Sequence, residues 1–284
     1  MARLSRRAFV VAWAGGIVAA AGAAGAYAWR IEPNRISLSR RTLPLPRWPE
    51  DEPPLKVGQL TDLHCDSFPS VLRARRAADL LMKQNPDLVV LTGDFVTSHG
   101  EQWAEPAADV LSQTARAPMG AFAVLGNHDY WSNSSEVLMR ELGRIGVPVL
   151  QNEALPVPGR RNLWILGVKS IATGAADAKV AAIGVPENAV KILLAHEPDF
   201  VDFAGIKAVV QLSGHSHGGQ VRIPFLPVWT PAGARKYHTG FYPHAPIPIY
   251  VSRGIGTIGP PMRFRCPPEA TVLTLTAAVS AMER

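Results

Sequence analysis

Short apolar runs alternate with amphipathic stretches along the chain from residue 55 onward. Runs of this length bounded by Gly, Pro, Asn and Asp predict strands, and stretches with apolar residues three and four apart predict helices. Strands that first alternate with helices and then follow one another directly indicate an α/β domain built in layers. The predicted strands span residues 56–61, 87–91, 120–125, 147–151, 163–168, 190–195, 208–212, 220–223, 249–252 and 271–276, and the predicted helices span residues 71–83, 103–115 and 135–145.

The N-terminus carries a different pattern, an uncharged and mostly apolar run of 22 residues at positions 8–29. At about 1.5 Å per residue, a helix of this length just reaches across the roughly 30 Å hydrocarbon core of a bilayer. The motif Ser5-Arg6-Arg7 precedes the run and resembles a twin-arginine export signal, and Ala26-Tyr27-Ala28 offers a cleavage position of the A-x-A kind. The pattern therefore predicts a chain that is membrane-anchored or exported through the twin-arginine machinery. A retained membrane anchor and a cleaved signal are both open, and in either case the body would lie outside the cytoplasm.

Residues 31–54 are rich in Arg and Pro and show no regular period. Such a composition predicts a linker, with a short lead-in strand near residues 35–38. The expected organisation is thus a signal or anchor at 1–30, a linker at 31–54 and a folded body at 55–284.

The charge of the chain is unevenly distributed. The formal net charge is +6, but residues 1–47 hold eight arginines and one acid (+7), whereas residues 48–284 hold 21 Lys and Arg against 22 Asp and Glu (−1). The basic character therefore belongs to the N-terminal tail and not to the body. A nucleic-acid partner, which would need a basic face on the folded body, is not expected.

Metal-capable side chains follow five of the predicted strands. Ligand sites in open α/β sheets form at the carboxyl ends of the strands, so these five segments are expected to converge on one crevice. Glycines stand beside several of them and permit a positive φ and a close approach of the backbone. The residues, in chain order, are Asp62, His64, Asp94, Asn127, His128, Asp129, His196, His215 and His217.

The spacing of these residues suits metal binding. Asp62 and His64 are two positions apart, so an extended backbone points both side chains to the same face. Asp94 carries two oxygens and could bridge a pair of ions. A donor set of nitrogen and oxygen without thiolate favours Mn, Fe or Zn over Ca or Mg.

The two cysteines, Cys65 and Cys266, form no CxxC pair. They therefore indicate neither a thiolate zinc site nor a disulfide framework. Buried free thiols and a disulfide close to the crevice are both compatible with the sequence.

The five segments read D-x-H, G-D, G-N-H-D, H and G-H-x-H, in this order, over residues 62–217. This combination resembles the calcineurin-like metallophosphoesterase family. The segments at 252–256 and 263–269 further resemble an exported, membrane-anchored bacterial subgroup of wall-associated phosphoesterases and of enzymes that act on nucleotide-linked lipid precursors. The resemblance spans about residues 55–276 and implies a four-layer α/β/β/α sandwich with two divalent metal ions at the carboxyl ends of the central strands.

The resemblance also implies a role for each residue. His128 would protonate the leaving oxygen. Asp129 has two open roles, since it could orient His128 or cap the helix that follows it. One ion would be held by Asp62, His64 and His217, the other by Asn127, His196 and His215, and Asp94 would lie between the two.

The activity that the resemblance implies is hydrolysis of a phosphoester, with a hydroxide between the metal ions attacking phosphorus. The predicted anchor suggests a cell-envelope or lipid-linked phosphate as substrate. An alternative enzyme is a pyrophosphatase for a UDP-linked lipid of the UDP-2,3-diacylglucosamine type. A different class, a non-catalytic binding module on the same scaffold, is disfavoured because no ligand of the motif set is missing.

Two further features have alternative interpretations. Arg253 could bind a substrate phosphate or pair with a structural carboxylate. Residues 224–248 are rich in Pro and aromatic side chains and predict a long loop. Loops of that length are often functional, so it could shape an apolar or sugar-binding rim, or it could simply pack on the body.

Overall fold

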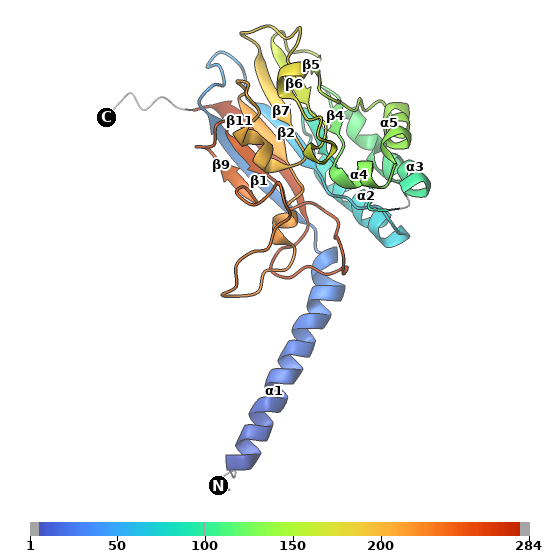
Figure 1. Cartoon of the computed structure of the whole chain (residues 1–284), viewed down its shortest axis with the longest axis vertical. Coiled ribbons are helices and arrows are strands. Elements are labelled where there is room, and N and C mark those ends of the chain that lie inside the picture. Colours follow the sequence, from blue (N-terminus) through green and yellow to red (C-terminus); the bar gives the residue numbers. More distant parts are fainter. Residues whose placement is uncertain (1–5, 99, 279–284) are drawn as a thin grey trace, which may run out of the picture.

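The computed structural model describes residues 6–98 and 100–278, in which two β-sheets pack face to face (Figure 1). The layered α/β architecture expected from the sequence is confirmed. In spatial order the first sheet holds β1 (Ser37–Leu45), β11 (Glu269–Ala277), β2 (Leu55–Leu60), β3 (Leu88–Thr92) and β4 (Ala121–Val124), and the second holds β5 (Glu153–Pro156), β6 (Leu163–Gly167), β7 (Val190–Leu194), β8 (Val210–Ser213), β10 (Ile249–Val251) and β9 (Gly240–Tyr242).

The direction of the strands decides where the polar segments meet. In the first sheet β2, β3 and β4 run parallel to one another, while β11 is parallel to β1 and antiparallel to β2. In the second sheet β6, β7, β8 and β10 are parallel, and β5 and β9 are antiparallel at the edges. Parallel strands end at the same edge of a sheet, so the segments after β2, β3 and β4 lie together, as do those after β7 and β8.

The main core lies between the two sheets. Leu88 and Val90 of β3 point into it, whereas Val89 and Leu91 point to the opposite face and pack under helices. Because β3 is buried on both faces, its sequence is an unbroken apolar run and not an alternating one.

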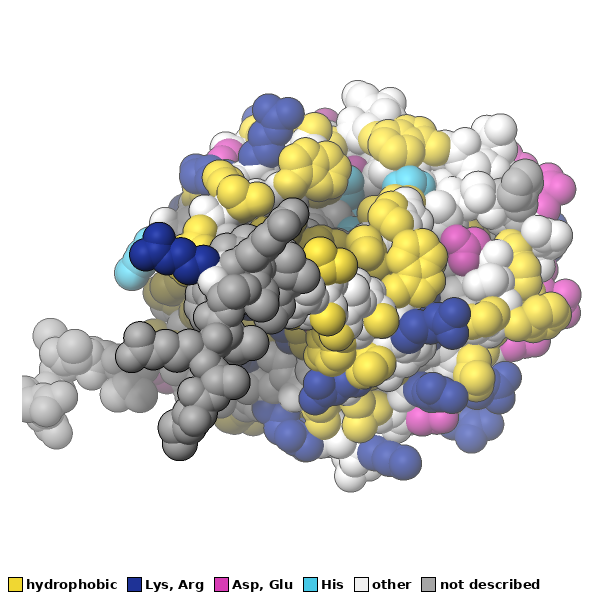
Figure 2. All heavy atoms as spheres, turned by 90° about the horizontal axis from the view of Figure 1, so that it is seen from below, with side chains coloured by type: hydrophobic (Ala, Val, Ile, Leu, Met, Phe, Trp, Pro, Cys, Tyr) yellow, Lys and Arg dark blue, Asp and Glu magenta, His cyan; other side chains and the backbone are white. Residues whose placement is uncertain are grey.

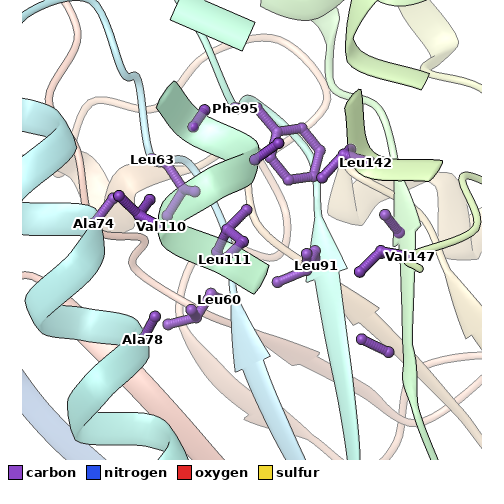
Figure 3. Packing of buried hydrophobic residues seen from close by; sticks show 14 of the residues in the cluster. Leu60, Leu63, Ala74, Ala78, Leu91, Phe95, Val110, Leu111, Leu142 and Val147 are labelled. Carbon is purple, nitrogen blue, oxygen red and sulfur yellow. The ribbon is translucent and has the colours of Figure 1, made fainter. Parts of the chain in front are cut away.

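Three helices cover the outer face of the first sheet: α2 (Phe68–Met82), α3 (Gly100–Leu111) and α5 (Ser135–Arg144). Ser67 caps α2, and its side chain accepts a hydrogen bond from the N–H of Ser70. Figure 3 shows side chains of α2 and α3 packing over Leu60 and Leu91. The outer face of the second sheet is covered more thinly by short helices, α6 (Ala178–Ala181), η4 (Ile171–Thr173) and η5 (Pro198–Asp202).

The apolar N-terminal run forms α1 (Arg6–Ala26), which extends away from the sheets (Figure 1). The prediction of a membrane anchor is wrong, because no helix within residues 6–98 and 100–278 is both long and apolar enough to cross a membrane. Nine alanines and four glycines make up most of the 21 residues of α1, and these side chains offer little apolar surface. Ser5, the first residue of the predicted export motif, lies outside the described residues.

After α1 the chain is packed into the body through η1 (Tyr27–Ile31) and η2 (Glu32–Asn34). Ala28 is buried, and its carbonyl accepts a 2.9 Å hydrogen bond from the N–H of Arg263. The carboxylate of Glu32, also buried, accepts a hydrogen bond from the N–H of Cys266. The A-x-A motif therefore ends inside packed structure.

The stretch assigned to a linker contains the nine-residue strand β1, which pairs along its length with β11. The short lead-in strand predicted at 35–38 overlaps only its first two residues, and the rest was missed because β1 lies at the edge of the sheet. Edge strands tolerate Pro44, which cannot donate to a neighbouring strand, and the exposed side chains of Arg40 and Arg41.

Several other boundaries differ from the prediction. The strands expected at 147–151 and 220–223 are reduced to single bridges, Val149 with Ala123 and Val221 with Phe264. The short strands β5 and β9 were not expected, since their residues are largely exposed or half-buried and carry little apolar signal. The end of the folded body predicted at 284 lies outside the described residues, which stop at 278.

Glu269 joins the two sheets at the start of β11. Its carboxylate accepts a 2.6 Å hydrogen bond from the hydroxyl of Tyr250 in β10 and a 2.6 Å ionic hydrogen bond from Nε of Arg253. Burial alone would raise the pKa of Glu269, but the charge of Arg253 and the hydrogen bonds from Tyr250 and Arg253 outweigh it, so the pKa lies below its usual value. Of the two roles considered for Arg253, the structure supports the second: its side chain pairs with the structural carboxylate of Glu269.

We expect Glu269→Gln to lower the free energy of unfolding by about 1–3 kcal/mol at neutral pH, because a charged hydrogen bond is lost and Arg253 is left without its partner. A carboxylate with a lowered pKa in the folded state stabilises the fold above its unfolded pKa of about 4.3 and loses this effect as the pH falls through the folded pKa. Urea unfolding at about pH 7 and at about pH 3 should therefore show a smaller difference between wild type and variant at the lower pH. An equal difference at both pH values would contradict the ion pair.

Candidate metal centre

The predicted ligands converge on one site at the carboxyl ends of the central strands. They occupy the first turns of chain after β2, β3, β4, β7 and β8, and each is buried. Side chains from both sheets thus meet where the two sheets end. The residues brought together are Asp62, His64, Asp94, Asn127, His196, His215 and His217.

Backbone hydrogen bonds tie the ligand loops to one another. The N–H of Asp62 donates to the carbonyl of Gly93 (2.9 Å), and the N–H of His64 donates to the carbonyl of Asp94 (3.1 Å). Across the sheets, the N–H of His215 donates to Oδ1 of Asp62 (3.0 Å). The positions of the ligands are therefore set by the main chain before any ion is considered.

One cluster contains Asp62, His64, Asp94 and His217. The two imidazoles approach through their Nε2 atoms, 3.0 Å apart. Nε2 of His217 lies 3.4 Å from Oδ1 of Asp62, and Nε2 of His64 lies 3.6 Å from Oδ2 of Asp94.

A second cluster contains Asp94, His196 and His215. Nδ1 of His215 lies 3.2 Å from Nε2 of His196, which in turn lies 3.1 Å from Oδ2 of Asp94. The same oxygen of Asp94 therefore faces both clusters. Its other oxygen, Oδ1, accepts a 2.9 Å hydrogen bond from the N–H of His128.

The far sides of three imidazoles are already engaged. Nδ1 of His196 donates to the carbonyl of Thr92 (2.7 Å), and Nε2 of His215 donates to the carbonyl of Ala232 (2.8 Å). Nδ1 of His64 lies 2.9 Å from the hydroxyl of Thr97. A carbonyl fixes the proton on the nitrogen facing it, so the nitrogen that faces the cluster keeps its lone pair, as a metal ligand requires.

The arrangement fits divalent metal ions. Two nitrogens bound to one ion at about 2.0–2.1 Å lie about 2.9 Å apart at a right angle and about 3.4 Å apart at a tetrahedral angle. The separations of 3.0 Å and 3.2 Å in the two clusters fall in this interval. The Oδ1 atom of Asn127 is also buried with no hydrogen-bond partner among the described residues, which a metal ion would supply.

The electrostatics of the site agree with this fit. Burial lowers the pKa of His64 to about 3, and it also lowers the pKa values of His215 and His217, so these imidazoles stay neutral at pH 7. Burial would lower the pKa of His196, but the charge and hydrogen bond of Asp94 raise it, and the Asp94 pKa is held below its usual range in return. Asp94 and His196 thus form a buried pair in which each favours the charged form of the other.

Burial raises the pKa of Asp62 to about 7, and the negative charge of Asp94 adds to this shift. Two carboxylates this close repel each other unless cations separate them. A metal ion is the compensating charge that the donor set lacks.

Five of the seven predicted ligands have a left-handed backbone, with φ between 46° and 65°. This region is sparsely populated for residues other than Gly, and it persists only where the surroundings enforce it. The residues are Asp62, His64, Asp94, His215 and His217.

Two glycines allow the loops to approach closely. A Cβ at Gly126 would collide with the carboxylate of Asp94, and a Cβ at Gly214 would collide with Thr61 and with the carboxylate of Asp62. The glycines of the motifs G-N-H-D and G-H-x-H are therefore required by contact, and not by a positive φ at these positions.

Asp129 caps α4 (Asn127–Trp131) and does not orient the ring of His128. Its carboxylate accepts hydrogen bonds from the N–H groups of Gly126 (2.8 Å), Asp94 (3.0 Å), Phe95 (2.9 Å) and Val96 (3.2 Å). Burial raises its pKa to about 8, with Asp94 adding to the shift, while the N–H groups favour the carboxylate. Of the two roles left open for Asp129, the structure has the helix cap, and the same carboxylate also fixes the backbone of the Asp94 loop.

His128 lies at the entrance to the centre. Its ring packs edge-on against His64 (5.1 Å between centroids) and Trp131 (5.2 Å), and it is half-buried. A cavity of about 660 Å³, here called the site cavity, opens above the ligands and is lined by His128 together with Asp94 and Asn127. A phosphate in this cavity would contact both the centre and His128.

The walls of the site cavity could not be located from the sequence. Its apolar side chains come from α4, from η4 and from two loops, and only Trp229, Pro231 and Ala232 among them belong to the stretch considered as a rim. Thr97 and Ala232, which fix His64 and His215, were also not predicted, since no sequence pattern marks them. The apolar wall residues include Trp131, Ile171, Val221, Trp229, Pro231 and Ile258.

Asp66 and the cysteines lie outside the two clusters. Asp66 accepts a hydrogen bond from the hydroxyl of Ser70 at the start of α2. Cys65 and Cys266 are buried free thiols, and Sγ of Cys266 donates to the carbonyl of His217.

We expect Gly214→Ala to reduce the metal content of the purified protein strongly, because the added methyl group displaces Asp62 or Thr61. Overpacking of this kind should also lower the free energy of unfolding by about 1–3 kcal/mol. Elemental analysis and thermal unfolding measure the two effects.

The matched control is Gly143→Ala in α5, where an added Cβ meets no atom within 4 Å. This variant should keep its metal and gain up to about 1 kcal/mol from helix propensity. Metal retention by Gly214→Ala equal to that of the control would contradict the close-approach argument.

The chain is similar in sequence to known metallophosphoesterases. Residues 55–219 match the calcineurin-like phosphoesterase family. The chain is 30% identical over 286 residues to YkuE, an uncharacterized metallophosphoesterase of Bacillus subtilis (strain 168), with 97% of this chain and 99% of that protein covered. It is 30% identical over 278 residues to the phosphodiesterase YaeI of Escherichia coli (strain K12), with 96% and 99% covered. Among solved structures, TT1561 of Thermus thermophilus aligns with a TM-score of 0.49 at 12% identity, over 71% of this chain and 90% of that chain.

The match of residues 55–219 covers more than half of the 284 residues and includes every segment of the metal centre. The two relatives extend the similarity over nearly the whole chain. The protein belongs to the calcineurin-like phosphoesterase family and is a metal-dependent hydrolase of phosphoester bonds.

Proposed function

We propose that the protein hydrolyses a phosphodiester that carries an apolar, lipid-like group next to the scissile phosphate. The observation that carries this proposal is the chemistry of the site cavity, which has polar ligands at its base and apolar walls above them. Cavities of this kind bind amphipathic molecules, with the polar groups fixing orientation and the walls burying the rest.

The base of the site cavity suits a phosphate. Two divalent ions held by the seven ligands would bring four positive charges against the two negative charges of Asp62 and Asp94, attract a phosphate and lower the pKa of water. Asp94 places Oδ2 toward both clusters, and its Oδ1 is fixed by the N–H of His128. The chain therefore holds the phosphate site and the backbone of His128 in one rigid unit.

His128 supports proton transfer to the leaving oxygen. Its ring lines the site cavity, and no side-chain hydrogen bond within the described residues engages it. Trp131 and His64 hold the ring from two sides, which restricts it to orientations that face the cavity. A general acid in this position typically contributes about 10²–10⁴ in rate.

The walls support an apolar substituent on the substrate. Trp131 and Trp229 belong to segments far apart in the sequence, yet both line the site cavity, and Ile171 and Ile258 add aliphatic surface. Both tryptophans are more than half exposed, which leaves apolar area free to be covered by substrate.

A diester is favoured over a monoester by the similarity to YaeI, which is named a phosphodiesterase. A pyrophosphate that links a nucleotide to a lipid is the second candidate, because the same walls would hold its lipid portion. The products distinguish the two: the second candidate releases a lipid monophosphate and a nucleotide.

We expect His128→Gln to reduce kcat/KM about 10²–10⁴-fold for a phosphodiester with an alkyl leaving group, because an alkoxide needs a proton as it departs. The reduction should be much smaller for a nitrophenyl leaving group, which departs as a stable anion. The metal content should not change, since His128 is not among the predicted ligands. Equal losses on both substrates would contradict the role of His128 as an acid.

We expect Trp229→Ala to raise KM about tenfold for a phosphodiester with a long acyl or alkyl group, because apolar contact area is lost. The KM for the methyl analogue of the same diester should stay within about twofold. Steady-state kinetics on this matched pair of substrates make the measurement. An equal effect on both would show that Trp229 does not contact the apolar group.

A further inference from the structure

The loop at residues 223–229, here called the apolar loop, exposes large hydrophobic side chains to solvent. Phe225 is fully exposed, and Leu226 and Trp229 are 61% and 75% exposed. Pro224 and Pro227 fix two φ angles, so the loop presents these side chains with little conformational freedom. Exposed apolar surface of this extent marks an interaction site.

The apolar loop lies beside the end of α1 that joins the body (Figure 1). Arg265 lines one hollow with Ile223 and Phe225, and a second hollow with Tyr27 and Arg35. The view along α1 in Figure 2 shows many hydrophobic side chains on this face, interspersed with Lys and Arg side chains and with some Asp and Glu side chains. The apolar loop is therefore part of a wider face and not an isolated protrusion.

The sequence on either side of the apolar loop is free of acidic residues. No Asp or Glu occurs between Asp202 and Glu269 in the sequence. Arg222 and Arg265 flank the apolar loop in the structure. Among the cations of this stretch Arg265 is exposed, whereas Arg263 is fully buried and both Arg253 and Lys236 are paired with carboxylates.

The apolar loop is also continuous with the site cavity. Trp229, its last residue, forms part of the cavity wall, and Val221 on the other side of the loop does so as well. An apolar group could therefore pass from the outer surface to the metal centre along a path lined by this loop.

We propose that the apolar loop inserts into the surface of a lipid layer with anionic headgroups, with the exposed Arg265 contacting the headgroups. Exposed aromatic and aliphatic side chains beside a cation suit the boundary between headgroups and acyl chains, which binds them by apolar burial and by charge attraction. This contact needs no helix that spans the layer. The inference rests on the proposed function and deepens it, because it assigns the lipid layer as the place from which substrate is taken.

A fluorophore sensitive to polarity, placed on the apolar loop, tests the contact directly. Phe225→Cys provides an exposed thiol, while both native cysteines are buried and should not react. A label on the loop is needed because α1 also exposes apolar side chains, such as Trp13, and could bind vesicles by itself. The matched control is Ile183→Cys, which exposes a similar apolar position after α6, on the outer side of the second sheet.

With vesicles of phosphatidylcholine mixed with phosphatidylglycerol, the emission of the label at position 225 should shift to shorter wavelength and the label at position 183 should not respond. Vesicles of phosphatidylcholine alone should give a weaker response. Adding Arg265→Gln should raise the half-saturating lipid concentration about fivefold, as expected for the loss of one cation near an anionic surface, whereas Arg116→Gln, remote in sequence from this face, should leave it unchanged.

No response at position 225 in vesicles that bind the chain would overturn the proposal, and so would equal responses at positions 225 and 183. An equal response with both vesicle types would overturn the role of Arg265. Turnover of a soluble aryl phosphodiester by the same labelled protein separates this inference from the proposed function. If turnover is intact but the lipid response is absent, only the lipid contact is contradicted. If the lipid response is present but turnover is absent, only the proposed activity is contradicted.

Discussion

The structure depends on the burial of seven metal-capable side chains at the place where two sheets end. Two carboxylates, one amide and four imidazoles share this volume, and their polar atoms would be costly to bury without strong partners. The loop-to-loop hydrogen bonds, the cap formed by Asp129 and the parallel order of β2, β3 and β4 all act to hold these groups together. The same burial keeps three imidazoles neutral and leaves Oδ1 of Asn127 without a partner among the described residues. Bound cations would supply a partner for these lone pairs.

The ligand loops also carry conformational strain. A left-handed backbone at a residue other than Gly costs about 1–3 kcal/mol, and five of the ligands adopt it. The strain is held in place by neighbouring structure: Gly256 donates to the carbonyl of Asp62, and Arg263 is fully buried and donates to the carbonyls of Gly254 and Gly256. The C-terminal loop thus supports the ligand loop from behind, which explains why this segment lies in the core although it contributes no ligand.

Sequence alone could predict the central strands and the ligands that follow them, because β2, β3, β7 and β8 are buried on both faces and their apolar runs end in charged or imidazole side chains. It predicted only a short lead-in strand at 35–38 and missed most of β1, since an edge strand needs no apolar alternation and tolerates Pro44. It overestimated α1, because a count of uncharged residues does not measure apolar surface when most of them are Ala or Gly. The cavity walls could not be predicted for a different reason. Trp131 and Trp229 line the same cavity only because the two sheets pack against each other.

The pairing of β1 with β11 joins residues near the two ends of the chain, with Ser37 opposite Glu269. During synthesis the first sheet therefore remains open at β2 until the last strand has emerged, although Asp62 and Asp94 are made early. Contacts between such distant positions close slowly, and the exposed edge of β2 offers a template for wrong pairing in the interval. Residues 269–277 carry no metal ligand, yet they complete the sheet whose strands β2 and β3 position Asp62 and Asp94.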